Sequence, residues 1–508
     1  MDIMPSLYRT NAFRVIGLPV EATPKDIRRK ADMLRMSETL GTPAPQGRSP
    51  LPLDATATVD EVREALQRLR DPERRLVEEI FWFWPVEPGR SVDDPALTAL
   101  AQGDFKEACA IWRDTDAGGI GLHNLAVLTH ALALDHEQDA TRESLTLSPT
   151  DRVNINKLWR QAFLDWNAAI REEGFWQRLT QRIHELDDPR LTSASAIKIR
   201  GDLPLALLSL SARLAVQAGE QQNTADGARH LAVIRNSGFD ASTCVEALRV
   251  SLGSVRQRIQ ALCSTAETEA DADPAHADRV TTRLLDQAAP LVSVIDFLPA
   301  GDPMRDGTHD QLALSALACQ IPYGNKSGDW KGSLALLERV IGVAVSDSAR
   351  DRIQRNIDIV TANLAHEREI GTCWFCANDK PDERSKFVVK MYGEVVHSGT
   401  RVTWRVLDVD VPRCRGCKRK HSTADSVATL AFLALAITGF SVCGAGNAEG
   451  AALGIGWVCF FGAFALFSMV KRSIYGGIKA IGAATAFPAV ERRRKDGWAV
   501  GAKPPGVE

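Results

Sequence analysis

Cys373-Trp-Phe-Cys376 and Cys414-Arg-Gly-Cys417 are the two short sequences that decide how the C-terminal part of this chain folds. Between them lie two runs rich in β-branched and aromatic side chains, at 386–392 and 401–411, with Gly393 as one of the turn residues. Such runs favour two antiparallel strands, and a hairpin returns the second cysteine pair to the first. The sequence therefore predicts a small sheet with four thiols gathered at one end.

Four cysteines in this arrangement are typical of a metal site. Each Cys-x-x-Cys turn can offer two thiolates to one tetrahedral Zn²⁺, and four thiolates leave no open position for a substrate. Residues 371–421 resemble a zinc ribbon, in which Gly416 lets the second turn approach the metal. A dithiol redox pair and a catalytic zinc are the alternatives, and His397 or His421 could replace one ligand. The predicted ligands of a structural Zn²⁺ are Cys373, Cys376, Cys414 and Cys417.

Two uncharged apolar runs follow, at 426–443 and 451–470. Each approaches the roughly 20 residues that cross a bilayer as a helix, and basic clusters flank the pair. We expect a transmembrane helical hairpin over 425–472 in an integral membrane protein with both termini cytoplasmic (in the inner membrane if the chain is bacterial). The basic cytosolic tail, 473–508, is expected to lie along the bilayer surface. Two buried core helices are the alternative.

The N-terminal part contains NAFRVIGLPVEATPKDIRRKADML from residue 11 and ALQRLRDPERR from residue 65. Thr23-Pro24 predicts the start of a helix, and a second helix is expected from about 59 to 83, interrupted at 71–75. Residues 1–85 resemble the J-domain of DnaJ-type co-chaperones, which implies an Hsp70-type chaperone or its clients as partners. The segment 41–50 reads GTPAPQGRSP, so the His-Pro-Asp tripeptide by which J-domains stimulate Hsp70 is missing from this position. The resemblance therefore implies docking without activation.

The basic face of the first of these helices corresponds to the face that J-domains present to Hsp70. A solvated helix side is the alternative. The partner-binding residues implied by the resemblance are Lys25, Arg28, Arg29 and Lys30.

Aromatic residues and histidines further along the chain suit a helical core better than a site. Phe81-Trp-Phe-Trp84 is expected to pack a helix end onto the next domain, with a partner-binding patch as the alternative. His184, His230 and His309 have no second ligand at metal spacing and are expected at the surface or at helix caps. Three tryptophans at helical spacing are expected in the core: Trp159, Trp166 and Trp176.

The middle of the chain, 95–366, is expected to be an α-helical repeat body. LTALAQGDFKEACAIWRD, from residue 97, and a second Gly-Asp-aromatic-Lys phrase at 328–341 resemble tetratricopeptide repeats, in which small residues let paired helices stack. An α-solenoid of this kind presents a concave surface to peptides or partner helices.

Composition bounds the function. The chain has 508 residues, ten cysteines and a formal net charge of −3, which gives no reason to expect nucleic-acid binding. It contains none of the Gly-x-x-x-x-Gly-Lys-[Ser/Thr], His-Glu-x-x-His and Gly-x-Ser-x-Gly motifs. The predicted fold is mainly α: a J-like module, an α-solenoid-like body, a small β zinc ribbon and a two-helix transmembrane hairpin.

The function expected from these parts is that of a membrane-anchored, cytosol-facing adaptor or co-chaperone-like scaffold that recruits proteins, and not that of an enzyme. The first alternative is a membrane thiol-redox or metal-dependent enzyme that uses the Cys-x-x-Cys pairs. The second is a regulatory subunit of a stress or defence complex.

Overall fold

The computed structural model describes residues 1–423 and 480–505, apart from 2, 43–46, 54, 116–117, 143–147 and 399–400. Within 424–479 it describes only Ser426, Leu430 and Gly462. The described chain is mainly helical with one small antiparallel sheet. It divides into two compact units: Met1–Lys326 with Arg339–Ile353, and Ser327–Glu338 with Gln354–Glu508.

The first unit begins with four helices whose ends are set by capping residues. Thr23 and Asp26 form a reciprocal capping box and Pro24 occupies the first turn, so the start of the second helix is where Thr23-Pro24 predicts it. Asp71 ends the third helix, and its side chain caps the fourth. The interrupted helix expected near 59–83 is therefore two helices. The four are α1 (Ala12–Ile16), α2 (Pro24–Leu40), α3 (Val59–Arg70) and α4 (Pro72–Ile80).

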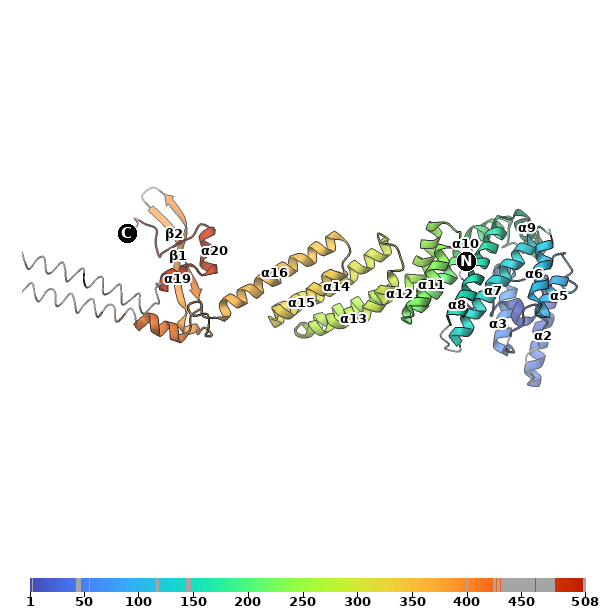
Figure 1. Ribbon diagram of the computed structural model, residues 1–508, viewed down its shortest axis with the longest axis horizontal. Helices are drawn as coiled ribbons and strands as arrows, with labels where there is room; N and C mark the ends of the chain where they lie inside the picture. The colour runs from blue at the N-terminus through green and yellow to red at the C-terminus, as the bar shows by residue number, and fades with distance from the viewer. Residues whose placement is uncertain are drawn as a thin grey trace, which may run out of the picture. The chain divides into compact units, whose positions relative to one another are not determined.

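The rest of the first unit is a body of helices in which neighbours in sequence pack together: α5 with α6, α7 with α8, α10 with α11, and α12 with α13 (Figure 1). α5 and α6 meet at the predicted Gly-Asp turn, where Gly103 is left-handed and Asp104 caps α6. Assignment to tetratricopeptide repeats stays a prediction. The helices are α5 (Pro95–Ala101), α6 (Phe105–Asp114), α7 (Ile120–Arg142), α8 (Pro149–Arg171), α9 (Glu173–Leu186), α10 (Ser193–Glu220), α11 (Thr224–Arg235), α12 (Ala241–Ala272), α13 (Ala277–Ile295) and α14 (Pro303–Ser327).

The aromatic run at 81–84 lies in the core of this unit. All four side chains are buried, and the rings of Phe83 and Trp112 stack at a centroid distance of 5.8 Å. Trp84 packs edge-on against Phe175 of α9. The packing role expected for this run is therefore confirmed, and the three core tryptophans predicted on α8 and α9 are also buried.

The histidine expectations hold only in part. His184 is exposed, as expected. His230 is buried against Glu137 and Trp159, and His309 is buried between Asp296 and the Val343 carbonyl. The sequence shows a lone histidine but not the carboxylate that the fold brings to it.

The second unit contains the sheet, with strand order β2-β1-β3, and Figure 1 labels β1 and β2. β1 (Phe387–Ser398) and β2 (Arg401–Val411) form the predicted hairpin, and β3 (Ala499–Val500) pairs antiparallel with β1. α19 (Ala480–Thr485) supplies Ala484 to the core beneath β1, α20 (Pro488–Lys495) supplies Val490, and Phe487 at the N-cap of α20 completes it. The part of the predicted tail at 480–501 thus folds onto the sheet. Two further helices, α15 (Trp330–Val343) and α16 (Asp347–Gly371), are each divided between the two units.

The structure contradicts the expected integral-membrane localisation. Among the residues that it describes, no helix is both long enough and apolar enough to cross a bilayer. The hairpin expected over 425–472 falls outside the described residues, apart from three single positions. The apolar composition on which the expectation rested cannot by itself distinguish a span from other uses of an apolar run.

Candidate metal centre

The β1–β2 hairpin brings the two cysteine pairs together, as the sequence predicts. Phe387 at the start of β1 faces Val411 at the end of β2, so the open end of the hairpin lies beside both pairs. The Trp374 N–H donates to the Pro412 carbonyl at 2.9 Å, and the Asp382 N–H donates to the Arg413 carbonyl at 3.1 Å. These bonds join the segments that carry the two Cys-x-x-Cys turns, which we call the first knuckle (373–376) and the second knuckle (414–417).

The four thiols converge on one point. The Sγ atoms of Cys373, Cys376, Cys414 and Cys417 all lie within 4.8 Å of one another, and those of Cys376 and Cys414 are 3.9 Å apart. In a tetrahedral zinc site with Zn–S bonds of about 2.3 Å, the sulfurs are about 3.8 Å apart. The predicted ligand set therefore fits a tetrahedral metal ion.

The backbone of the first knuckle places its thiols. The Ala377 N–H donates to the Cys373 carbonyl at 2.8 Å, and Ala377 adopts a left-handed conformation with φ of 56°. Gly416, to which the sequence interpretation gave the special turn, does not have a positive φ. The left-handed residue is therefore the alanine that follows the first pair, where composition gives no signal because alanine rarely adopts this conformation.

Asp379 is a neighbour of the cluster that sequence reasoning missed. Its Oδ2 lies 3.3 Å from Cys414 Sγ and 3.8 Å from Cys376 Sγ, and its carbonyl accepts the Cys373 N–H at 2.9 Å. It closes the first knuckle and places a carboxylate against two thiols. The only signal in the sequence was an acidic residue three positions after Cys376, which is too common to single out.

The thiols differ in acidity. Burial acts to raise the pKa of Cys373, but main-chain N–H groups of Cys414 and Cys376 outweigh it and bring this pKa down to about 7. Burial raises the pKa of Cys414 and of Cys417. Metal binding must displace protons from the thiols, so affinity for a metal rises with pH.

The two histidines considered as alternative ligands, His397 and His421, are not part of the thiol cluster. His421 Nδ1 lies 3.3 Å from Arg413 Nη1, and its ring packs edge-on against Phe375 at 4.8 Å. His397 pairs with Val402 beside the turn of the hairpin, at the opposite end from the cysteines. The group of four convergent ligands within the described chain consists of cysteines alone.

The predicted partner-binding face on α2 is only partly exposed. Lys25, Arg28 and Arg29 are exposed, but Lys30 is 7% exposed, and burial lowers its pKa. Lys30 is on the inner side because it follows Ile27 by three positions, close to one helical turn, and Ile27 is buried. Lys30 is therefore removed from the face.

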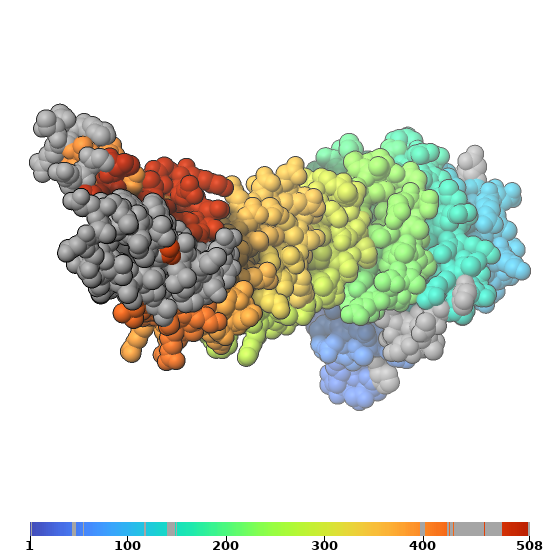
Figure 2. Space-filling view, turned by 60° about the vertical axis from the view of Figure 1, so that its left-hand side comes forward, coloured from blue at the N-terminus to red at the C-terminus, as the bar shows by residue number. Residues whose placement is uncertain are grey.

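An apolar stripe that the sequence analysis did not identify continues this face. Met33, Met36 and Leu40 are 46%, 65% and 68% exposed. At 100° per residue they share one side of α2 with the three exposed cations. In Figure 2 the N-terminal residues, in blue, stand out as a lobe from the rest of the first unit.

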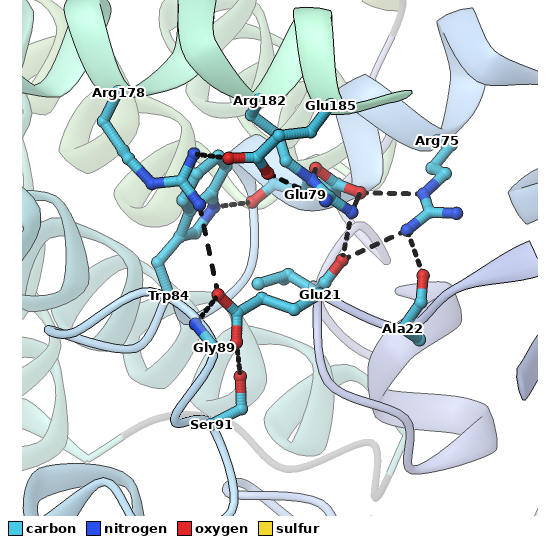
Figure 3. Close-up of polar contacts among 11 residues, drawn as sticks. Glu21, Ala22, Arg75, Glu79, Trp84, Gly89, Ser91, Arg178, Arg182 and Glu185 are labelled. Atoms are coloured by element: carbon cyan, nitrogen blue, oxygen red, sulfur yellow. Dashed lines mark hydrogen bonds and ion pairs between the residues drawn. The ribbon is translucent and has the colours of Figure 1, made fainter. Parts of the chain in front are cut away.

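A buried ion cluster joins the N-terminal helices to the helical body (Figure 3). Glu79, on α4, is fully buried and its carboxylate accepts from Arg75 Nε at 2.8 Å and from Arg182 Nε, on α9, at 3.0 Å. The same two guanidinium groups donate to the carbonyls of Ala22, at 2.6 Å, and Val20, at 2.9 Å. Every group named in this cluster hydrogen-bonds to another group of the protein. The cluster therefore has a structural role, which is to hold the helices together.

The segment 86–94, which joins the aromatic run to α5, is bound to the same region. Glu21 accepts from the Gly89 N–H at 2.7 Å and from the Ser91 hydroxyl at 2.6 Å, and Arg178 Nη2 lies 4.0 Å from its carboxylate (Figure 3). Glu21 therefore ties the loop before α2 to segment 86–94 and to Arg178 of α9.

Comparison with family models, curated proteins and solved structures gives no match for this chain. The resemblances to a J-domain and to tetratricopeptide repeats stay predictions.

Proposed function

We propose that the chain is a metal-stabilised adaptor that recruits a protein partner through the exposed face of α2. The observation that carries the proposal is the combination of Lys25, Arg28 and Arg29 with the apolar stripe Met33, Met36 and Leu40 on one side of a single helix. Exposed methionines adapt to the shape of a bound surface, and clustered cations attract an acidic one. The partner is therefore a protein with an acidic rim around an apolar groove.

An Hsp70-type chaperone is the partner that we propose first. The support is the J-like sequence of residues 11–34 and 65–75 and the basic character of α2. The missing His-Pro-Asp tripeptide implies that binding leaves ATP hydrolysis unchanged. In this role the protein holds a chaperone or its client and is not an activator.

The four cysteines supply the second part of the proposal, a structural Zn²⁺. A compact group of four thiolates fits a closed site, and bound zinc adds roughly 10–16 kcal/mol of apparent binding free energy in small zinc domains. The site acts through folding, because a closed site offers no position to a substrate.

The test measures binding of purified full-length protein to an Hsp70-type chaperone and the chaperone's ATP turnover. We expect Arg28→Glu/Arg29→Glu to weaken binding about tenfold or more, because both charges are reversed on the contact face. Arg256→Glu is the control, since Arg256 is also exposed but belongs to α12. Strong acceleration of ATP hydrolysis, or unchanged binding by the double variant, contradicts the proposal.

A second candidate is thiol-redox activity at the same cysteines, and the close approach of the four sulfur atoms favours it. Thiol titration separates the two candidates. Four thiols protected by bound metal support the structural site, and one readily titrated, reversibly oxidised pair supports the redox function.

A further inference from the structure

The two residues between Cys373 and Cys376 contact parts of the chain on both sides of 424–479. The Trp374 indole N–H donates to the Ala483 carbonyl at 2.6 Å, and its ring packs edge-on against Phe487 at 5.3 Å. Both contacts lie after that segment in sequence. Trp374 is therefore the direct link from the first knuckle to α19 and to the start of α20.

Phe375 makes the corresponding contact on the other side. Its ring packs edge-on against His421 at 4.8 Å, and His421 comes four residues after Cys417. The Cys417 N–H donates to Cys414 Sγ at 3.3 Å, so the backbone that leads to His421 is itself tied to the thiol cluster. Adjacent residues of one knuckle thus hold the chain before and after 424–479.

The core of the sheet is assembled from both sides as well. Val389, Met391 and Val411 come from the hairpin, and their buried partners Ala484, Phe487 and Val490 come after the segment. Without the second set, one face of the hairpin would expose its apolar side chains to water. A two-stranded hairpin alone is marginally stable in water. The hairpin and the segment that contains Ala484, Phe487 and Val490 therefore depend on each other.

We propose that metal binding by the four cysteines stabilises the packing of residues 480–501 on the sheet, and we call this packing the clasp. The same contacts fix the chain on both sides of residues 424–479. The proposal rests on the metal site proposed above. When Cys373 and Cys376 bind the same ion, the turn that carries Trp374 and Phe375 is fixed at both of its ends. Because coupling between two equilibria is reciprocal, metal tightens closure of the C-terminal segment, and closure tightens metal binding.

Hydrogen exchange of the full-length protein, read on peptides from 484–501, tests the clasp together with the metal content of each sample. We expect removal of zinc by a chelator to speed amide exchange in these peptides about tenfold or more, and added Zn²⁺ to restore protection. Peptides of α10 serve as the internal reference, and their exchange should not change.

Trp374→Phe tests the linkage in the other direction. This change removes the indole donor and keeps an aromatic ring, and we expect Zn²⁺ to transfer to a competing chelator about tenfold faster. Trp404→Phe is the matched control, because its indole N–H donates to the Ala502 carbonyl (3.1 Å), beyond residues 480–501, from the end of β2 that is farther from the cysteines. The control should release zinc at the wild-type rate.

The outcomes separate the clasp from the metal site on which it rests. If the purified protein contains zinc but its 484–501 peptides stay protected after a chelator has removed the metal, the clasp alone is overturned. An unchanged rate of zinc release from Trp374→Phe also overturns the clasp alone. Wild-type protein that binds no metal overturns both.

Discussion

Arg182 binds the carboxylate of Glu79, which lies 103 residues earlier in the chain, in a region from which water is excluded. Arg75 binds the same carboxylate, so two buried cations share one buried anion. Such an arrangement gives little net stability when intact, because removing the charges from water is costly. Losing one partner is expensive, since the remaining charges stay buried without compensation.

Glu79→Gln should therefore lower the free energy of unfolding by about 3–5 kcal/mol, because it leaves buried Arg75 without its anion and Arg182 with Glu185 alone. Urea unfolding of the full-length protein, followed by tryptophan fluorescence, measures the change. Asp60→Asn is the control. It removes an exposed anion paired with Arg63 and should change stability by less than about 0.5 kcal/mol. Similar effects of the two substitutions would contradict the structural role of the cluster.

Acid should destabilise the first unit in two steps. Burial lowers the pKa of His123 to about 4 and that of His130 to about 3. Because the unfolded histidines titrate near 6.5, their contribution to stability is complete above pH 6.5 and is lost progressively as the pH falls toward these folded values. Burial acts to raise the pKa of Glu137, but hydrogen bonds from His230 and Arg229 outweigh it and hold it at about 2. The contribution of Glu137 to the free energy of unfolding is complete above about pH 4.5 and is lost as the pH falls toward 2.

His123→Phe tests the first step, because phenylalanine can keep the stack on Phe175 and does not titrate. Between pH 6.5 and 4 the wild-type protein should lose about 3 kcal/mol of unfolding free energy through His123, and the variant should lack this loss. His184→Gln, at an exposed position, is the control substitution. A profile of the same slope in His123→Phe would show that the buried imidazole is not the source.

Gly393→Ala should displace the C-terminal segment. A methyl group at Gly393 would lie 2.6 Å from Trp498 Cδ2, which is closer than carbon atoms can approach. We expect faster hydrogen exchange at 498–501 and about 1–3 kcal/mol less stability of the second unit. Gly482→Ala, on α19, meets no atom within 4 Å and replaces a helical glycine, so it should be neutral or slightly stabilising. Equal protection in Gly393→Ala and wild type would place Trp498 elsewhere.

Local patterns predicted the parts of this fold that are built locally. Thr23-Pro24 fixed the start of α2 through its own side chain and ring, and the turn residues between β-rich runs predicted the hairpin that gathers the four cysteines. The aromatic run at 81–84 was expected to be buried because so much apolar area is rarely left exposed.

The sequence did not reveal contacts between distant segments. Nothing near Glu79 indicates that Arg182 will reach it, and nothing near Asp379 indicates that two thiols will lie beside it. The basic run of α20 suggested a bilayer surface, whereas two apolar residues that precede the run, Phe487 and Val490, pack on the sheet. Lys30 was misassigned because charge alone does not show on which side of a helix a residue lies.

The metal content of the purified full-length protein tests the central claim most directly. Wild-type protein should contain about one Zn²⁺ per chain with four thiols protected from alkylation. Cys373→Ser/Cys414→Ser should contain none, because it removes a ligand from each knuckle. Cys109→Ser/Cys244→Ser, which changes two cysteines outside the cluster, should keep the wild-type content. Metal-free wild-type protein, or full zinc content in Cys373→Ser/Cys414→Ser, would contradict the account.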